Sequence, residues 1–220
     1  MRAPLSSLVL LGLCSTILAQ AVNCTLLGHF HHYNYDPFIA LWGYAAPNGD
    51  EYALIGTTAG TIVVDVTNPT NPIQRKWLPW GFASTRDIRT YSHYAYVVTA
   101  ANPGFQILDL SNPNSPVALG VFGTLHSNRA RNVCVDVGAG RLYLVGCDTG
   151  TLVYDLTQNP FNPTFLGYAL PGGVANEVND LCVENGYAYG ATRSTSMMRI
   201  VDASAPLPWT ALSITGVPAA

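Results

Sequence analysis

Short apolar stretches recur along the chain, and each ends in an aspartate followed by a proline-containing turn. In "TIVVDVTNPTNP" (61–72), Ile62 and Val64 fall on one face of an extended segment, because successive side chains of a strand point to opposite sides. Val63 and Asp65 fall on the other face. No segment shows a convincing helical period. The pattern therefore predicts short β-strands joined by tight turns.

The same pattern occurs four times, with the aspartate returning every 44 to 47 residues. Each copy holds an aromatic-rich strand, the strand that ends in aspartate, a proline elbow and a further apolar strand. A strand upstream of the aromatic one, joined to it by a tight turn, makes four strands per copy in most cases. A fixed period of this length indicates a repeat architecture. The four aligned positions are Asp65, Asp109, Asp155 and Asp202.

Four short antiparallel strands in about 45 residues are typical of one blade of a β-propeller. One blade is too small to bury both of its faces, so neighbouring blades must stack. We predict an all-β fold, a β-propeller of about four four-stranded blades. The predicted blades span residues 37–80, 81–124, 125–170 and 171–220.

The predicted ring does not close easily. "TLLGHF", within residues 24–32, resembles the outermost strand "VALGVF" at 117–122, and such a strand near the N-terminus usually completes the last blade. No fifth copy follows for it to complete. We therefore expect an open or partial ring, with the chain forming the N-terminal part of a longer propeller or an open arc. The alternative is a closed four-blade ring.

The first 21 residues have the features of a secretory signal peptide. Arg2 is followed by the uncharged stretch "LSSLVLLGLCSTILA", and 19–21 (Ala-Gln-Ala) fit the small-x-small cleavage pattern. The alternative, a membrane anchor, needs about 20 apolar residues, more than this stretch provides. Residues 22–220 would then be the mature domain, secreted or displayed at the cell surface, without a later membrane span.

Composition and cysteine count add constraints. The net charge of −3 and the 10% content of charged residues exclude the basic surface that nucleic-acid binding requires. Cys24, Cys134, Cys147 and Cys182 remain after signal removal and would permit two disulfides, in any of three pairings. Cys134 and Cys182 occupy the same repeat position, which favours buried side chains over disulfide partners. Asn23 begins a glycosylation sequon, relevant if the host is a eukaryote.

Three longer stretches carry a family resemblance: "WGYAAPNGDEYALIGTTAGTIVVDVTNPTNP", "STRDIRTYSHYAYVV" and "GFQILDLSNP". The chain resembles the LVIVD-repeat proteins over most of residues 27–206, in particular those of the choice-of-anchor B type. The resemblance implies a secreted or surface-displayed propeller and no defined reaction. Similar proteins tend to carry His-Asn or His-Asp where this chain has Arg131-Asn132 and Asn179-Asp180. A metal or ligand site that relatives build there would lack most of its histidines here.

Two repeated sets of polar residues are candidates for a site. The four repeat aspartates could ring a channel and bind a divalent cation, but a carboxylate before a turn also accepts backbone hydrogen bonds, and we interpret them as structural. The second set lies on the first strand of three blades, which lines the channel of a propeller. Its ligand-binding candidates are Arg86, Asp87, Arg131, Asn132, Asn179 and Asp180. The alternative for this set is a network of inter-blade salt bridges and strand-end hydrogen bonds.

A histidine-rich segment near the mature N-terminus is a weaker candidate for a metal site. Histidines at this density can bind a transition metal, although no repeat copy contains the cluster. The residues are His29, His31, His32 and Asp36.

These features lead to three hypotheses. The first is a non-catalytic module that binds an extracellular protein or glycan. The second is a metal-dependent hydrolase or lyase with its site at the channel mouth. The third is a partial propeller with a mainly structural role. The first fits the residues best, because no histidine accompanies the acidic and polar residues of the channel column.

Overall fold

The computed structural model describes residues 24–31, 37–171, 178–192 and 197–216. It confirms the predicted fold class: sixteen strands form four four-stranded antiparallel sheets, and the described residues contain no helix. The described residues therefore include no helix that could span a membrane. The segment predicted to be a signal peptide, 1–21, lies outside the described residues.

The sheets follow one another along the chain, and each is built from consecutive strands. Blade 1 contains β1 (Phe38–Ala45), β2 (Glu51–Thr57), β3 (Gly60–Asp65) and β4 (Ile73–Pro79). Blade 2 contains β5 (Arg86–Tyr91), β6 (Tyr94–Thr99), β7 (Phe105–Asp109) and β8 (Val117–Phe122). Blade 3 contains β9 (Asn132–Asp136), β10 (Arg141–Cys147), β11 (Gly150–Asp155) and β12 (Thr164–Pro171). Blade 4 contains β13 (Val178–Glu184), β14 (Tyr187–Thr192), β15 (Met197–Asp202) and β16 (Ala211–Gly216).

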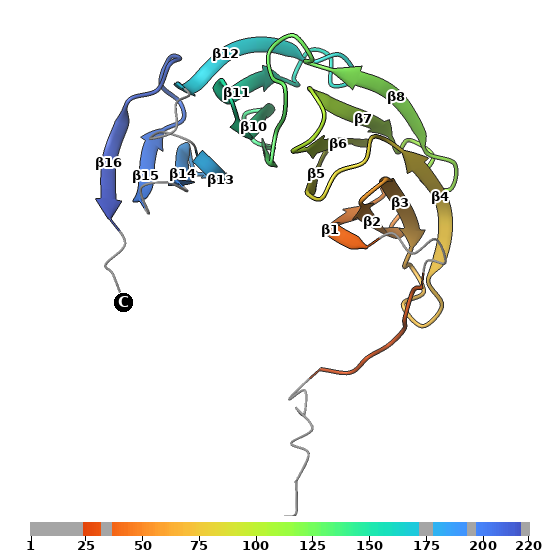
Figure 1. Ribbon diagram of the computed structural model, residues 1–220. Helices are drawn as coiled ribbons and strands as arrows, with labels where there is room; N and C mark the ends of the chain where they lie inside the picture. The colour runs from red at the N-terminus through yellow and green to blue at the C-terminus, as the bar shows by residue number, and fades with distance from the viewer. Residues whose placement is uncertain (1–23, 32–36, 172–177, 193–196, 217–220) are drawn as a thin grey trace, which may run out of the picture.

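The four blades form an open arc (Figure 1). The first strand of each blade lies on the concave side and the fourth on the convex side. The inner strands are neighbours, since β1 contacts β5, β5 contacts β9 and β9 contacts β13. The alternative of a closed four-blade ring is therefore wrong.

Each blade packs against the next through apolar side chains on one face. We call the face toward the following blade the leading face and the face toward the preceding blade the trailing face. At the three contacts, leading-face residues meet trailing-face residues as follows: Leu54 and Val63 meet Ile88 and Leu108; Tyr96 and Phe105 meet Leu142 and Tyr154; Tyr143 and Val153 meet Leu181 and Val201. All these residues are buried. Because both faces of the middle blades are covered, the second and third strands of these blades are buried along almost their whole length.

The N-terminal segment differs from the prediction of an outer strand over 24–32. Its described part, 24–31, belongs to no sheet. Each of the four sheets already has its outer strand, and the segment instead contacts the trailing face of blade 1, where Phe30 packs against the cluster of Ile55, Ile62 and Val64.

Candidate functional site

Arg86, the first residue of the predicted channel column, is buried and binds backbone carbonyls of blade 1 and its connection to blade 2. Its Nε donates to the oxygen of Thr57 at 2.9 Å, and Nη2 donates to the oxygens of Trp80 and Gly81 at 2.7 and 2.9 Å. The guanidinium also lies over the Trp80 ring, 5.4 Å from its centroid. Burial lowers the pKa of Arg86 to about 10. The side chain joins blade 2 to blade 1 and presents little surface to a ligand.

Glycine makes room for this arginine. A Cβ built on Gly56 would lie 3.1 Å from Cδ of Arg86 and 2.8 Å from Cβ of Ala40. In blade 3 a glycine at a different repeat position faces the arginine of its own blade, since a Cβ on Gly146 would lie 2.8 Å from Cβ of Arg131. The small residue on the second strand is thus matched to the polar side chain beside it.

The Asp87 carboxylate accepts hydrogen bonds from its own strand, β5, and from β9 of the next blade. Its Oδ1 accepts hydrogen bonds from the Ile88 N–H at 2.9 Å and from Nη1 of Arg89 at 2.7 Å. Its Oδ2 accepts the Val133 N–H of blade 3 at 3.0 Å. Arg89 in turn lies over the Trp42 ring of blade 1, 4.4 Å from its centroid. This carboxylate therefore bonds blade 2 to blade 3.

The remaining column residues are spread along two blades. The side-chain oxygens of Asn132 and Asn179 are buried and accept no hydrogen bond within the described part of the chain. Asp180 is exposed, and its Oδ1 accepts the Leu181 N–H at 2.9 Å. Asp180 thus repeats the local bond of Asp87 but lies on the last blade.

The four repeat aspartates make one common contact. Each Oδ1 accepts the backbone N–H of the residue two positions later, at 2.8–2.9 Å. The donors are Thr67, Ser111, Thr157 and Ser204. This is the geometry of an Asx turn, which fixes the chain as it leaves the third strand.

The candidate metal segment is described only in part. The rings of His29 and His31 have centroids 6.3 Å apart, whereas His32 and Asp36, like Asn23, lie outside the described residues. Within the described ranges, no group of three or more His, Cys, Asp or Glu side chains is arranged to hold a metal ion. Of the two cysteines in one repeat position, Cys134 is buried, with its pKa raised to about 11 by burial, and Cys182 is exposed.

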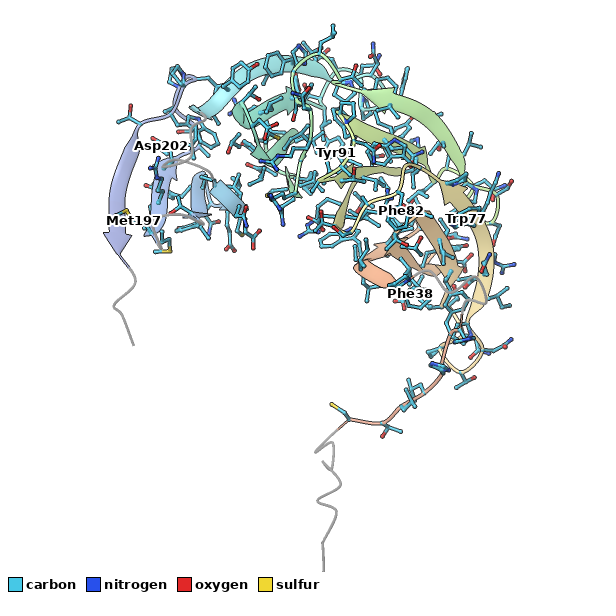
Figure 2. The ribbon with its side chains drawn as sticks, in the orientation of Figure 1. Phe38, Trp77, Phe82, Tyr91, Met197 and Asp202 are labelled. Atoms are coloured by element: carbon cyan, nitrogen blue, oxygen red, sulfur yellow. The ribbon has the colours of Figure 1, made fainter. Side chains whose placement is uncertain are left out.

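Two exposed apolar residues lie on the connections between blades, and the sequence analysis missed both. Phe82 is 75% exposed on the connection from blade 1 to blade 2, and Leu125 is 94% exposed on the connection from blade 2 to blade 3. Figure 1 shows these connections running across the same side of the arc, and Phe82 is labelled in Figure 2. We call the surface of residues 80–85 and 123–131 the connection face. The sequence feature that could have indicated these two residues is an apolar residue shortly after Trp-Gly in one copy and after Phe-Gly in the next.

The connection face is held by the blades beneath it. In the first connection, the Ala83 N–H donates to the Thr58 oxygen at 2.8 Å. In the second, His126 stacks on Phe165 with centroids 3.8 Å apart. Arg129 of the same connection forms an ion pair with Asp148 at 2.6 Å. The exposed apolar side chains are thus presented from fixed loops, as binding residues on rigid scaffolds usually are.

The comparisons with known proteins agree with the repeat pattern. The LVIVD repeat family matches residues 49–75 and 83–124, most of blade 1 and all of blade 2. This chain contains LVIVD repeats. No curated protein matches it.

Solved structures share the fold at low sequence identity. A protein assigned as a 6-phosphogluconolactonase from Bacteroides fragilis is 13% identical, with a TM-score of 0.62 over 80% of this chain and 55% of that chain. Its counterpart from Bacteroides uniformis is 11% identical, with a TM-score of 0.60 over 76% and 50%. A chain of the nidogen/laminin complex is 9% identical, with a TM-score of 0.52 over 76% and 59%. This chain therefore spans about half the length of the propeller-like structures it matches.

Proposed function

We propose that this LVIVD-repeat chain is a non-catalytic binding module of a secreted or cell-surface protein of the choice-of-anchor B type. The connection face is its ligand-binding surface, and an extracellular protein is its ligand. The observation that supports this is the exposure of Phe82 and Leu125, one on each of two consecutive connections between blades. Large exposed apolar side chains that are presented from fixed loops are typical of protein-interaction sites.

The contacts of the inner-strand residues Arg86 and Asp87 support the same proposal. Arg86 and Asp87 are committed to bonds with neighbouring blades and connections, which leaves them poorly placed for acid–base chemistry on a substrate. A rigid scaffold with fixed, exposed apolar loops matches recognition of another surface better than it matches catalysis.

The test is binding of the purified protein to arrays of extracellular proteins and glycans, with a double variant and a matched control. Phe82→Ser with Leu125→Ser should weaken binding to the protein ligand by about tenfold or more, as loss of central apolar anchors does. Val137→Ser, at an exposed turn of blade 3, is the control and should bind as the unmodified chain does.

Two outcomes would overturn the proposal. Glycan binding that survives the double variant would mean another ligand class and another surface. Stoichiometric metal in the purified protein, with a melting temperature that falls on chelation, would favour the hydrolase or lyase hypothesis instead.

A further inference from the structure

The inter-blade contacts follow one scheme, so residues at corresponding positions can be compared between blades. Tyr96 and Tyr143 lie on the leading faces of blades 2 and 3 and are fully buried. The corresponding residue on the leading face of blade 4, Tyr189, is 38% exposed. Two further residues of that face, Tyr187 and Met198, are 44% and 41% exposed. Blade 4 therefore has the side chains of an inter-blade contact, and no blade covers them within the part of the chain that the structure describes.

The trailing face of blade 1 shows the complementary condition on its inner strand. Leu41 is 69% exposed, whereas its counterparts Ile88, Val133 and Leu181 are at most 5% exposed. Beside it, Gly43 takes the position that a threonine or valine fills in the other blades, and a Cβ there would meet nothing within 4 Å. A hollow of about 440 Å³ lies here, lined in part by Leu41, Gly43, Ala53 and Val66.

An exposed aromatic ring on blade 4 has the repeat position of a blade 2 ring, which packs on blade 3 at the place where this hollow lies in blade 1. At the contact of blades 2 and 3, Tyr94 and Val135 belong to one packed cluster. Tyr187 has the repeat position of Tyr94, and Gly43 has that of Val135. If blade 4 met blade 1 as blade 2 meets blade 3, the Tyr187 ring would fill the space above Gly43.

One polar contact fits the same pairing. Asp87 accepts one hydrogen bond within its own strand and a second from the Val133 N–H of the next blade. Asp180 has the position of Asp87 and makes the bond within its strand. Its Oδ2 accepts no hydrogen bond from any described residue. Leu41 has the position of Val133, so its N–H is the predicted donor to Asp180.

We propose that the leading face of blade 4 binds the trailing face of blade 1 of a second copy of this chain. The same contact made twice, head to tail, closes two arcs into one ring. Both complementary faces belong to this chain, which favours a second copy over an unrelated partner.

The contact uses the inner halves of both faces. Residues 25–28 and Phe30 line a hollow over β2 and β3, together with Ile55 and Val64, while Leu41 lies on β1, outside that hollow. The second copy therefore contacts β1 and β2 of one chain with β13 and β14 of the other. This surface is separate from the connection face, so the two proposals can fail independently.

Sedimentation velocity of the purified protein over a wide concentration range tests the proposal. The unmodified chain should form a species of twice the chain mass. Tyr189→Asp and Leu41→Asp each place a carboxylate in the contact and should raise the dissociation constant by about a hundredfold or more, as disruption of a central interface residue does. Each variant alone should sediment as a monomer.

A mixture of the two variants provides the decisive control. Tyr189→Asp keeps an intact trailing face and Leu41→Asp keeps an intact leading face, so one contact remains and the mixture should form a heterodimer. Val137→Asp, on neither face, should behave as the unmodified chain. If a charged variant fails to fold by circular dichroism, the corresponding serine variant replaces it.

The proposal is overturned by an unmodified chain that stays monomeric throughout, by variants that remain dimeric, or by a mixture that remains monomeric. A ladder of masses beyond the dimer would also overturn it, because the arcs would then not close.

Discussion

The trailing face of blade 1 and the leading face of blade 4 both lack a neighbouring blade among the described residues, and they differ in how they are covered. On the trailing face of blade 1, Ile62 and Val64 are buried, and Phe30 from a segment outside any sheet packs against them. On the leading face of blade 4, Tyr187 and Tyr189 are exposed. In Figure 2, Phe38 marks the first end and Met197 the second. A single irregular segment can thus cover part of a face that otherwise needs a neighbouring blade.

The comparison predicts that corresponding residues differ in their contribution to stability according to their blade. Tyr96→Ala removes a fully buried ring and a hydrogen bond from its hydroxyl to the Pro160 oxygen, and should lower the free energy of unfolding by about 3–5 kcal/mol. Tyr189→Ala should lower it by less than about 1 kcal/mol. Urea denaturation in the Leu41→Asp background, where association is blocked, measures both. Equal losses would mean that blade 4 is covered in solution by another part of the chain.

A feature local to one blade should not depend on the neighbouring blade. Asp109→Ala removes the acceptor of the Ser111 N–H in an exposed turn and should lower the free energy of unfolding by roughly 0.5–1.5 kcal/mol, the net value of one hydrogen bond. Asp109→Asn is the matched control, because the amide oxygen can still accept this bond. Thermal denaturation compares the two variants, and an unchanged Asp109→Ala midpoint would refute the structural interpretation of the repeat aspartates.

Phe30 tests whether the irregular segment stabilises blade 1. Phe30→Ala should lower the free energy of unfolding by about 1–2 kcal/mol, since the half-buried ring covers apolar surface of β2 and β3. Leu27→Ala, from the exposed part of the same segment, is the control and should change little. Urea denaturation measures both, and similar values for the two variants would show that the segment contributes no packing energy.

The smallest predicted effect is a pH dependence at Asp65. A hydrogen bond from Arg75, at 2.6 Å, is the main cause that lowers the pKa of this carboxyl below 3.8, so its contribution is present above pH 3.8 and is lost as the pH falls through the folded-state pKa. An exposed pair of this kind contributes roughly 0.2–1 kcal/mol. Denaturation of Asp65→Asn between pH 7 and acid should show a correspondingly shallower loss of stability. A profile identical to that of the unmodified chain would contradict this.

The sequence was sufficient to predict the architecture because its information is periodic. Alternating apolar residues define the strands, and the recurring aspartate and proline define the period of a blade. The same periodicity cannot predict which faces have a neighbour, since Tyr143 and Tyr189 look alike in the sequence and differ only through what lies opposite them. Phe82 and Leu125 were missed for a related reason, because a loop residue has no strand period to show whether it is exposed.

The order of strands in each sheet bears on how the chain can fold during synthesis. Within each sheet, every strand pairs with its neighbour in sequence. Each sheet can therefore form before the later segments are synthesised. Contacts that are local in sequence form quickly, and domains of this kind can fold from the N-terminus as they emerge from the ribosome. Each new blade would dock its trailing face on the exposed leading face of the one before it. The exposed leading face of blade 4 therefore resembles the face that each earlier blade exposes during synthesis, before the next blade docks on it.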